Sequence, residues 1–346
     1  MMTKTGTTIL FGMTCWLALA CNDLSAQESK SLSKVGTTAA QFLKFGAGAR
    51  SIAMGSAFSA VSDDINAIYW NPAGLSRIPG SGEATFNHSE WLAETNYDFA
   101  AFTLNLPNFG TLGFQTVFFG TPDEPVRTVN SPSGTGQVWN ATSIALGLSY
   151  ARSLTDRFAI GFTGKFIQEK VFNETARGAA FDLGVLYHTP FKSLRLGAAI
   201  TNFGTKMKLQ GRDIFFNEDP LTEQGSVDQV PAEYRLASYE IPLNLRFGLA
   251  YDVIRNDNIS IVAAADGAHP NDNTEFLNGG AELGLRKILY LRGGYKALFL
   301  RDSEQGLTLG FGLRYDTPGL NLKLDYAWAD YGRLDNVQFV SFTIRY

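Results

Sequence analysis

The chain has 346 residues, of which 45% are hydrophobic and 18% are charged, and its formal net charge is -4 at pH 7. This balance excludes a disordered chain and a bundle of membrane helices, and it gives no reason to expect nucleic acid as a partner. The 35 glycines, 26 phenylalanines and 13 tyrosines favour strands joined by tight turns.

The first segment of the chain has the pattern of an export leader. Lys4 precedes an apolar run from Ile9 to Ala20, which is long enough for a signal peptide and too short to cross a bilayer as a helix. We expect cleavage after Ala26, and a lipoprotein cut before Cys21 is the alternative. Both cysteines lie in or beside this leader, so we expect the mature chain to contain no disulfide, thiol nucleophile or cysteine-ligated metal.

The next segment, residues 46–78, is built largely of small residues and differs from the sequence that follows it. Asp63 and Asp64 are good N-cap residues for a short helix through Tyr69, and Pro72 is expected to end that helix. A compact segment placed before a long run of strands predicts a plug that the strands enclose.

Beyond about residue 84, apolar and polar residues alternate with a period of two, which is the pattern of β-strands with one apolar face. In one clear case, the apolar face carries Leu307, Leu309, Phe311, Leu313 and Tyr315. Candidate strands begin near Gly82, Tyr97, Gly110, Val138, Arg157, Arg177, Ser193, Glu240, Asn258, Glu275, Ile288, Glu304, Gly319 and Asn336. These are about fourteen strands, an even number as bacterial outer-membrane barrels require.

Two architectures fit such strands: a soluble sandwich with its apolar faces inward, and a membrane barrel with its apolar face toward lipid. The connections favour the barrel, because tight turns such as Thr317-Pro318 alternate with a set that includes two long loops, residues 120–137 and 209–239. Tyrosine also recurs at the lipid-facing position where alternate strands end, as in an aromatic girdle. These tyrosines are Tyr150, Tyr187, Tyr251, Tyr315 and Tyr346.

We therefore predict an all-β fold, an antiparallel transmembrane β-barrel of about fourteen strands with an N-terminal plug of short helices. Its predicted parts are a signal peptide at residues 1–26, a plug inside the lumen at residues 27–80 and the barrel at residues 81–346. The predicted location is the outer membrane of a Gram-negative bacterium, with outer-membrane lipid around the barrel. The final strand is expected to pair with the first, since an open sheet in lipid leaves costly unpaired backbone groups.

The polar side chains predicted to line the lumen carry charges of both signs. They are Arg195, Arg246, Arg292, Arg314, Lys323, Arg345, Asp182, Asp252, Asp316 and Asp325. Two interpretations stay open: a structural charge lattice that braces strands and plug, or a lining that selects a solute.

One motif carries a family resemblance. The run from Ala49 to Gly55, followed by Asp63-Asp64 and by residues 67–75, resembles the N-terminal signature of the PorV/PorQ family. Members of that family are outer-membrane barrels similar in fold to the FadL long-chain fatty-acid transporters. The residues that resemble the NPA element in the hatch of FadL-type barrels are Asn71, Pro72, Ala73 and Gly74. The resemblance implies that these residues help to plug the lumen.

The resemblance implies two functions. The PorV/PorQ family implies a non-enzymatic component or adaptor of type IX protein secretion, which would bind secreted cargo proteins and other secretion components. The loop at residues 209–239 would be the docking surface, through the candidate contact residues Phe215, Phe216, Leu221 and Tyr234. Similarity to FadL instead implies a passive transporter of a hydrophobic ligand, released through a kink in the wall that Gly110, Gly113 and Gly120 would permit.

The sequence contains no pattern that predicts catalysis. The three histidines, His88, His188 and His269, have no metal-ligand spacing, and Gly46-x-Gly48 lacks the other features of a phosphate loop. The oxygen-bearing residues between Asp266 and Glu275 match no ion-binding loop, so we interpret them as a solvated turn. We expect a protein that is not an enzyme and that carries no cofactor or metal.

Overall fold

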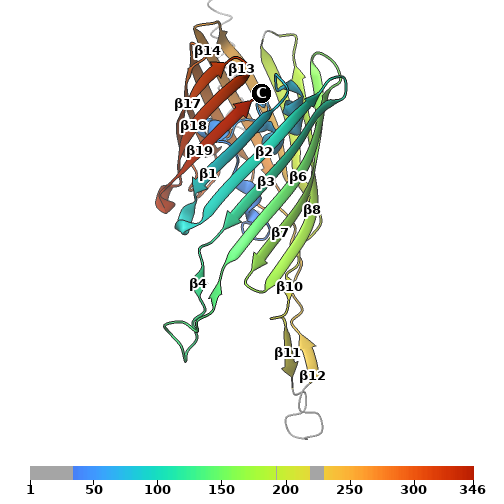
Figure 1. Ribbon diagram of the computed structural model, residues 1–346, viewed down its shortest axis with the longest axis vertical. Coiled ribbons are helices and arrows are strands. Elements are labelled where there is room, and N and C mark those ends of the chain that lie inside the picture. The colour runs from blue at the N-terminus through green and yellow to red at the C-terminus, as the bar shows by residue number, and fades with distance from the viewer. Residues whose placement is uncertain (1–33, 192, 219–229) are drawn as a thin grey trace, which may run out of the picture. The chain divides into compact units, whose positions relative to one another are not determined.

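The computed structural model describes residues 34–191, 193–218 and 230–346, so the predicted signal peptide lies outside the described residues. Within them, fourteen antiparallel strands form a closed barrel around a group of short helices (Figure 1). This confirms the predicted fold class. The wall strands are β1 (Glu83–Glu90), β2 (Asn96–Leu106), β3 (Gly110–Gly120), β6 (Ala141–Ser153), β7 (Phe158–Val171), β8 (Glu174–His188), β9 (Leu194–Gly204), β13 (Asn244–Arg255), β14 (Ile259–Pro270), β15 (Phe276–Leu285), β16 (Leu289–Leu298), β17 (Leu307–Thr317), β18 (Leu320–Asp330) and β19 (Asn336–Arg345).

The barrel closes in chain order. Each wall strand pairs with the wall strands before and after it in the sequence, and β19 pairs with β1, where Glu83 lies opposite Arg345. The predicted pairing of the final strand with the first is therefore confirmed. The predicted strand starts lie within a few residues of the observed ones. Chain order and alternation together were enough to predict the wall, because each strand hydrogen-bonds only to its neighbours.

The two ends of the barrel differ, as the connection lengths predicted. At the turn end, tight turns join pairs such as β2 to β3 and β17 to β18, and the chain finishes there. At the opposite loop end, two hairpins project beyond the wall, one made of β4 (Glu124–Pro125) and β5 (Val138–Trp139) and the other of β11 (Phe215–Glu218) and β12 (Val230–Glu233) (Figure 1). A short strand between them in sequence, β10 (Gln210–Gly211), extends the pairing of β8.

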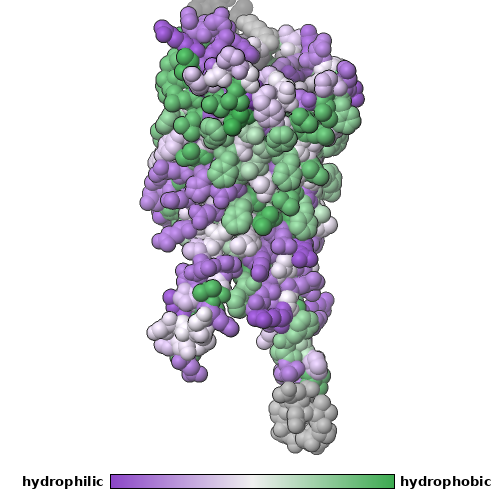
Figure 2. Space-filling view, in the orientation of Figure 1, coloured by the Kyte–Doolittle hydropathy of each residue, from purple (hydrophilic) through white to green (hydrophobic). Residues whose placement is uncertain are grey.

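The outer surface of the wall is apolar and its inner surface is polar. Leu309 and Leu313 are 47% and 46% exposed, whereas Arg246 and Arg292 on the other parity are 8% and 7% exposed. On the face in view, Figure 2 shows the result as a hydrophobic band across the barrel, with hydrophilic residues toward both ends. This architecture confirms the predicted integral outer-membrane protein, whose apolar band faces hydrocarbon.

The five tyrosines predicted to form a girdle all lie near the turn end. The hydroxyl of Tyr150 donates a hydrogen bond to the carbonyl of Phe109 at 2.6 Å, and the hydroxyl of Tyr346 donates one to the carbonyl of Thr103 at 2.7 Å. These two tyrosines thus join an apolar ring in the band to a polar backbone group at its edge, which is the behaviour expected at a membrane boundary.

The barrel encloses the plug, residues 40–78. Its elements are η1 (Gln41–Lys44), α2 (Ala49–Ala53), α3 (Ala67–Trp70) and η2 (Pro72–Arg77), and two further short turns, η3 (Leu92–Glu94) and η4 (Gly332–Leu334), lie in connections at the loop end. None of the helices in the described part of the chain has the length and apolar character to cross a bilayer. The predicted first plug residues, 27–33, lie outside the described residues.

The predicted helix of the plug is shorter than expected. Asp64 does not cap α3 directly; its carboxylate accepts the backbone N–H of Asn66, and the helix begins one residue later. Pro72 does not end helical structure either, because it opens η2 after a single extended residue, Asn71. A proline needs no backbone donor in the first turn of a helix, so the same residue ends one helix and begins the next.

The wall kink predicted at the glycines of β3 is absent. β3 pairs with β2 and β6 in unbroken register from end to end. A register shift occurs instead between β8 and β9, where Asn202 adopts a positive φ of 60° and its backbone N–H donates to Asp182 at 2.7 Å. The β3 glycines are accommodated within a regular strand, so their presence alone did not indicate a break.

Candidate functional site

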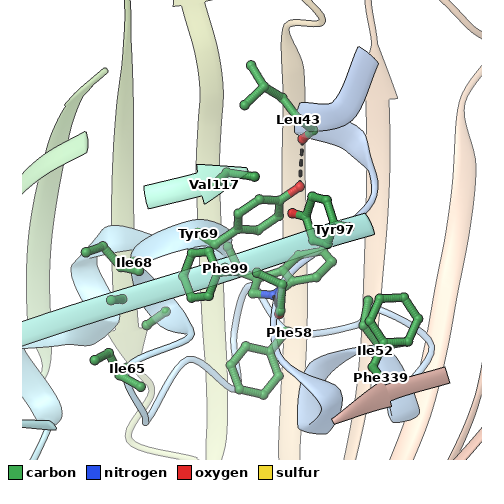
Figure 3. Close-up of a cluster of buried hydrophobic side chains, with 14 of the residues drawn as sticks. Leu43, Ile52, Phe58, Ile65, Ile68, Tyr69, Tyr97, Phe99, Val117 and Phe339 are labelled. Carbon is green, nitrogen blue, oxygen red and sulfur yellow. Dashed lines mark hydrogen bonds between the residues drawn. The ribbon is translucent and has the colours of Figure 1, made fainter. Parts of the chain in front are cut away.

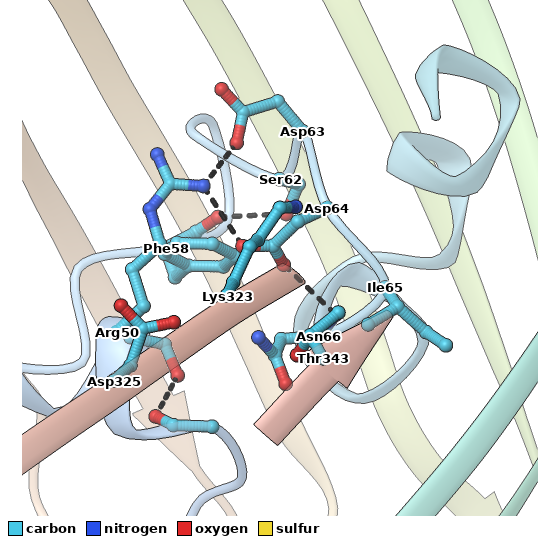
Figure 4. Close-up of polar contacts among 12 residues, drawn as sticks. Arg50, Phe58, Ser62, Asp63, Asp64, Ile65, Asn66, Lys323, Asp325 and Thr343 are labelled. Atoms are coloured by element: carbon cyan, nitrogen blue, oxygen red, sulfur yellow. Dashed lines mark hydrogen bonds and ion pairs between the residues drawn. The ribbon is translucent and has the colours of Figure 1, made fainter. Parts of the chain in front are cut away.

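Arg50 in α2 is the centre of a buried ion-pair network that joins plug to wall, and Figure 4 shows its bonds to Asp63 and Asp64 within the plug. Its guanidinium donates two hydrogen bonds of 2.8 Å to Glu282 in β15, and it also donates to Asp63 at 2.6 Å and to Asp64 at 2.8 Å. Glu282 in turn accepts from Arg292, which also bonds Asp325 at 2.6 Å. A planar guanidinium can hold several carboxylates at once, so Arg50 is fixed directly to β15 and is linked through Glu282 and Arg292 to β16 and β18.

A second node lies at the seam where the barrel closes. Glu83 at the start of β1 is fully buried and accepts hydrogen bonds from Lys323 and Arg345, both at 2.7 Å. Its other oxygen accepts the backbone N–H of Ile65 in the plug at 2.8 Å. Two cations and one plug amide therefore satisfy a single buried carboxylate, which is the condition under which a buried charge is tolerated.

The plug backbone lies directly against the wall at glycine positions. A Cβ on Gly280 would lie 2.3 Å from the carbonyl oxygen of Met54, and one on Gly294 would lie 2.2 Å from the backbone nitrogen of Gly55. The same holds for Gly197, whose Cβ would lie 2.2 Å from the carbonyl oxygen of Ser59. Only glycine permits such close approach of two backbones, so a side chain at any of these wall positions would displace the plug.

The predicted plug motif lies at the opposite side of the lumen, against β7 and β8. Asn71 is fully buried, and its amide nitrogen donates to the carbonyls of Ser59 in the plug at 2.7 Å and of Val185 in the wall at 3.0 Å. A Cβ on Gly184 would lie 2.1 Å from the side-chain oxygen of Asn71. Gly74 packs within the plug rather than against the wall, because its nearest neighbour is the carbonyl oxygen of Ser62.

Most of the charged residues predicted to line the lumen do face it. Arg195 pairs with Asp252 and Lys165 with Asp182, each at 2.6 Å. Arg246 lies over the ring of Trp70 at 4.8 Å, and Arg314 lies over Tyr290 at 4.9 Å. Eight of the predicted lining residues share the inward parity, although Asp316 is exposed at the turn end: Arg195, Arg246, Arg292, Arg314, Asp182, Asp252, Asp316 and Asp325. The pairing favours the structural lattice over a lining that selects a solute.

Two aspartates interpreted from sequence as parts of a solvated turn are buried instead. Asp266 in β14 accepts the backbone N–H groups of Phe58 and Ser59 at 3.0 and 2.8 Å. Asp272, in the connection between β14 and β15, pairs with Lys44 at 2.8 Å. Sequence could not reveal these roles, because the donors to both aspartates come from a plug more than two hundred residues away. Among the described residues no group of acidic, histidine or cysteine side chains could hold a metal ion.

The lumenal face is apolar rather than polar at the loop end. Rings from the plug, from β1 to β3 and from β19 pack together there, as the close-up of buried side chains shows in part (Figure 3). The central contact is the stack of Phe45 on Trp91 at 4.1 Å between ring centres. Phe119 meets Phe45 edge-on at 5.2 Å, and Tyr331 and Phe339 meet Trp91 at 5.3 and 6.0 Å. We call these five residues the aromatic mouth.

The aromatic mouth is partly open to solvent. Phe45, Trp91 and Phe119 are each of intermediate burial, whereas the rings beneath them, Tyr69 and Phe99, are 5% and 0% exposed. The hydroxyl of Tyr69 donates to the carbonyl of Leu43 at 2.7 Å, which ties the deeper layer to η1 (Figure 3).

Sequence reasoning missed the aromatic mouth, although β19 carries a signal for it. Val337 and Phe339 occupy the lumenal parity of β19 at that end, whereas the same parity carries Ser341 and Thr343 further along, and the apolar residues change sides between Phe339 and Val340. Such a loss of alternation indicates that the lumen itself is apolar at that level.

Comparison with solved structures relates this architecture to known channels. The chain is similar to the toluene transporter TodX of Pseudomonas putida, with 14% identity, a TM-score of 0.53 and coverage of 86% of this chain and 97% of that one. The CymD monoaromatic hydrocarbon channel gives 12% identity and a TM-score of 0.52, and covers 86% and 96%. The toluene transporter TbuX of Ralstonia pickettii is 15% identical with a TM-score of 0.50, and the match covers 86% of this chain and 97% of TbuX.

The chain has the fold of the FadL-like outer-membrane barrels. Identities of this size relate the folds alone. No family profile matches the sequence, and no curated protein matches it. The FadL-like part of the predicted resemblance is thus confirmed at the level of fold, and the narrower PorV/PorQ assignment stays a prediction.

Proposed function

We propose that this protein is a passive outer-membrane channel for small hydrophobic compounds, and that the aromatic mouth is where such a compound first binds. The observation that supports this proposal is the inversion of polarity at the loop end, because the interior of a transmembrane barrel is ordinarily polar. A partly exposed group of aromatic rings binds apolar compounds by burying their surface and by ring stacking. Structural neighbours named as toluene transporters and monoaromatic hydrocarbon channels support the same choice.

The ion-pair network complements the aromatic mouth. Below the rings, Arg50, Glu83 and their partners fill the lumen and fix the plug to several strands at once. Polar solutes and ions could pass through the lumen only by breaking buried ion pairs. A hydrophobic compound could instead move along apolar surfaces and into the membrane without breaking them. On this proposal the plug maintains the permeability barrier while the aromatic mouth collects the ligand.

Toluene uptake by cells that express variants of the protein tests the channel proposal. Trp91→Ala removes the central ring of the aromatic mouth and is expected to lower the uptake rate on the order of tenfold, the effect of about 1 kcal/mol or more of lost aromatic contact. Trp139→Ala is the matched control, because Trp139 lies on the projecting β4–β5 hairpin and is 38% exposed. Equal uptake by the two variants would refute the proposal.

The projecting β11–β12 hairpin favours a second candidate, the secretion adaptor. Phe215 and Tyr234 are 62% and 60% exposed there, and Phe216 stacks on Tyr234 at 4.7 Å, while Leu221 lies outside the described residues. Exposed aromatic residues on a surface hairpin suit protein contact. If the hairpin docks cargo, its deletion abolishes co-purification of surface proteins that share a C-terminal signal domain and leaves toluene uptake unchanged. Unchanged co-purification after the deletion would count against the adaptor.

A further inference from the structure

The outer wall of the barrel contains a recess of about 280 Å³ near the loop end. Gly267 in β14 forms its floor, between Phe247 in β13 and Leu277 in β15, which are its register partners. Phe247 and Leu277 are 61% and 46% exposed, so two large side chains stand on either side of a position that has none. Phe299, which is 83% exposed, closes the recess from the β16–β17 connection.

The recess belongs to the lipid-facing surface rather than to the lumen. Its floor residue has the outward parity, since Asp266 on one side of Gly267 and Ala268 on the other are buried at 1% and 4%. The same outward face of β14 continues toward the turn end through Ala265 and Ala263. Small residues therefore continue from the floor of the recess along the outward face of β14.

Polar groups line the recess at one end only. His269 Nδ1 and Glu275 Oε1 are hydrogen-bonded at 2.8 Å, and the two side chains are 64% and 69% exposed. They lie at the loop end of β14 and β15, where the wall reaches the membrane surface. The recess is thus polar next to water and apolar toward the bilayer centre, which matches the polarity of a lipid lying along the wall.

We propose that this recess binds an acyl chain of an outer-leaflet membrane lipid, whose headgroup lies beside His269 and Glu275. A hollow that faces hydrocarbon is a poor site for water, and leaving it empty forfeits the dispersion contacts of its lining. The recess holds a chain segment of several methylene groups, and it is continuous with the surface that lipid already covers. Because the driving force is close packing rather than removal from water, the fit at Gly267 decides occupancy. The proposal does not depend on the channel function.

Native mass spectrometry of the protein extracted from outer membranes in mild detergent tests the proposal. The wild type is expected to retain a lipid, identified by its mass after release. Gly267→Leu fills the recess without a clash, since the nearest atom to the new Cβ is Leu277 Cδ2 at 3.5 Å, and it is expected to lower lipid occupancy on the order of tenfold. Gly293→Leu is the matched control: this glycine of β16 also faces outward, and its nearest neighbour lies at 3.6 Å.

Each outcome of that experiment decides between occupants. Loss of lipid in Gly267→Leu and its retention in Gly293→Leu support the proposal. A wild type that carries no lipid, or equal retention in both variants, overturns it. A wild-type dimer that dissociates in Gly267→Leu also overturns it and makes a second copy of the chain the occupant. Heat-dependent migration in gels verifies that both variants remain folded barrels, and Trp91→Ala is expected to retain the lipid.

Discussion

Replacing Arg50 by alanine is expected to loosen the plug without opening the barrel. The substitution removes two hydrogen bonds to Glu282 and one each to Asp63 and Asp64. Glu282 keeps Arg292 as a partner, but Asp64 loses the ion pair that it makes within the described residues. Leaving a buried carboxylate without its cation costs about 3–5 kcal/mol, so the free energy that holds the plug in place falls by about that amount.

Hydrogen exchange measures this loss directly. If the plug opens locally, amides of residues 46–78 exchange about a hundred to several thousand times faster in Arg50→Ala, while amides of the wall strands are unchanged. Arg255→Ala is the control, because its side chain is 77% exposed and its pair with Asp252 is worth less than about 1 kcal/mol. Exchange of the plug that is no faster in Arg50→Ala than in Arg255→Ala would refute the reasoning.

Three further predictions concern the contacts of the plug. Gly280→Leu forces plug and wall apart, so we expect the free energy of unfolding to fall by about 1–3 kcal/mol and the conductance in planar bilayers to rise. Gly164→Leu is the control, because Gly164 faces outward and a Cβ there has nothing within 4 Å; we expect it to change neither quantity. Asn71→Ala removes two donated hydrogen bonds and leaves buried carbonyls unsatisfied, which is expected to lower the free energy of unfolding by about 1–3 kcal/mol; an unchanged denaturation midpoint would contradict this. Burial raises the pKa of Asp272, but hydrogen bonds from Lys44 and two neighbours outweigh it and hold that pKa below its ordinary value of 3.8. The carboxylate therefore stabilises residues 34–45 above pH 3.8 and ceases to do so as the pH falls through its lowered pKa, so protease cleavage of this segment is expected only in strong acid, and Asp272→Asn is expected to permit it at neutral pH.

The wall could be predicted from sequence because its rules are local. In β17, each residue from Leu307 to Tyr315 takes the side that its parity dictates, and a one-residue error would have placed every leucine in the lumen. Tight turns fix the order of neighbours, so strand count, closure and location followed from one pattern.

The lumen could not be predicted in the same way, because its contacts join distant parts of the chain. Nothing near Glu83 in the sequence indicates that Lys323 and Arg345 neutralise it, and nothing near Gly280 indicates that Met54 lies against it. Parity gave the direction of Arg246 but not its partner, which is the ring of Trp70 rather than a carboxylate. Pairing across a lumen depends on three-dimensional register, which alternation does not encode.

The position of α2 has a consequence for biogenesis. This helix, made early in synthesis, packs on β17, β18 and β19, the last strands to be made, and the backbone N–H of Ala49 donates to the hydroxyl of Ser341 at 2.7 Å. Docking of the helix against these strands therefore cannot be completed before the strands themselves are in place. A chain truncated before β19 would lose the strand pairing that closes the barrel and one of the strands on which α2 packs. Quality-control proteases would then meet an open barrel with an incompletely docked plug.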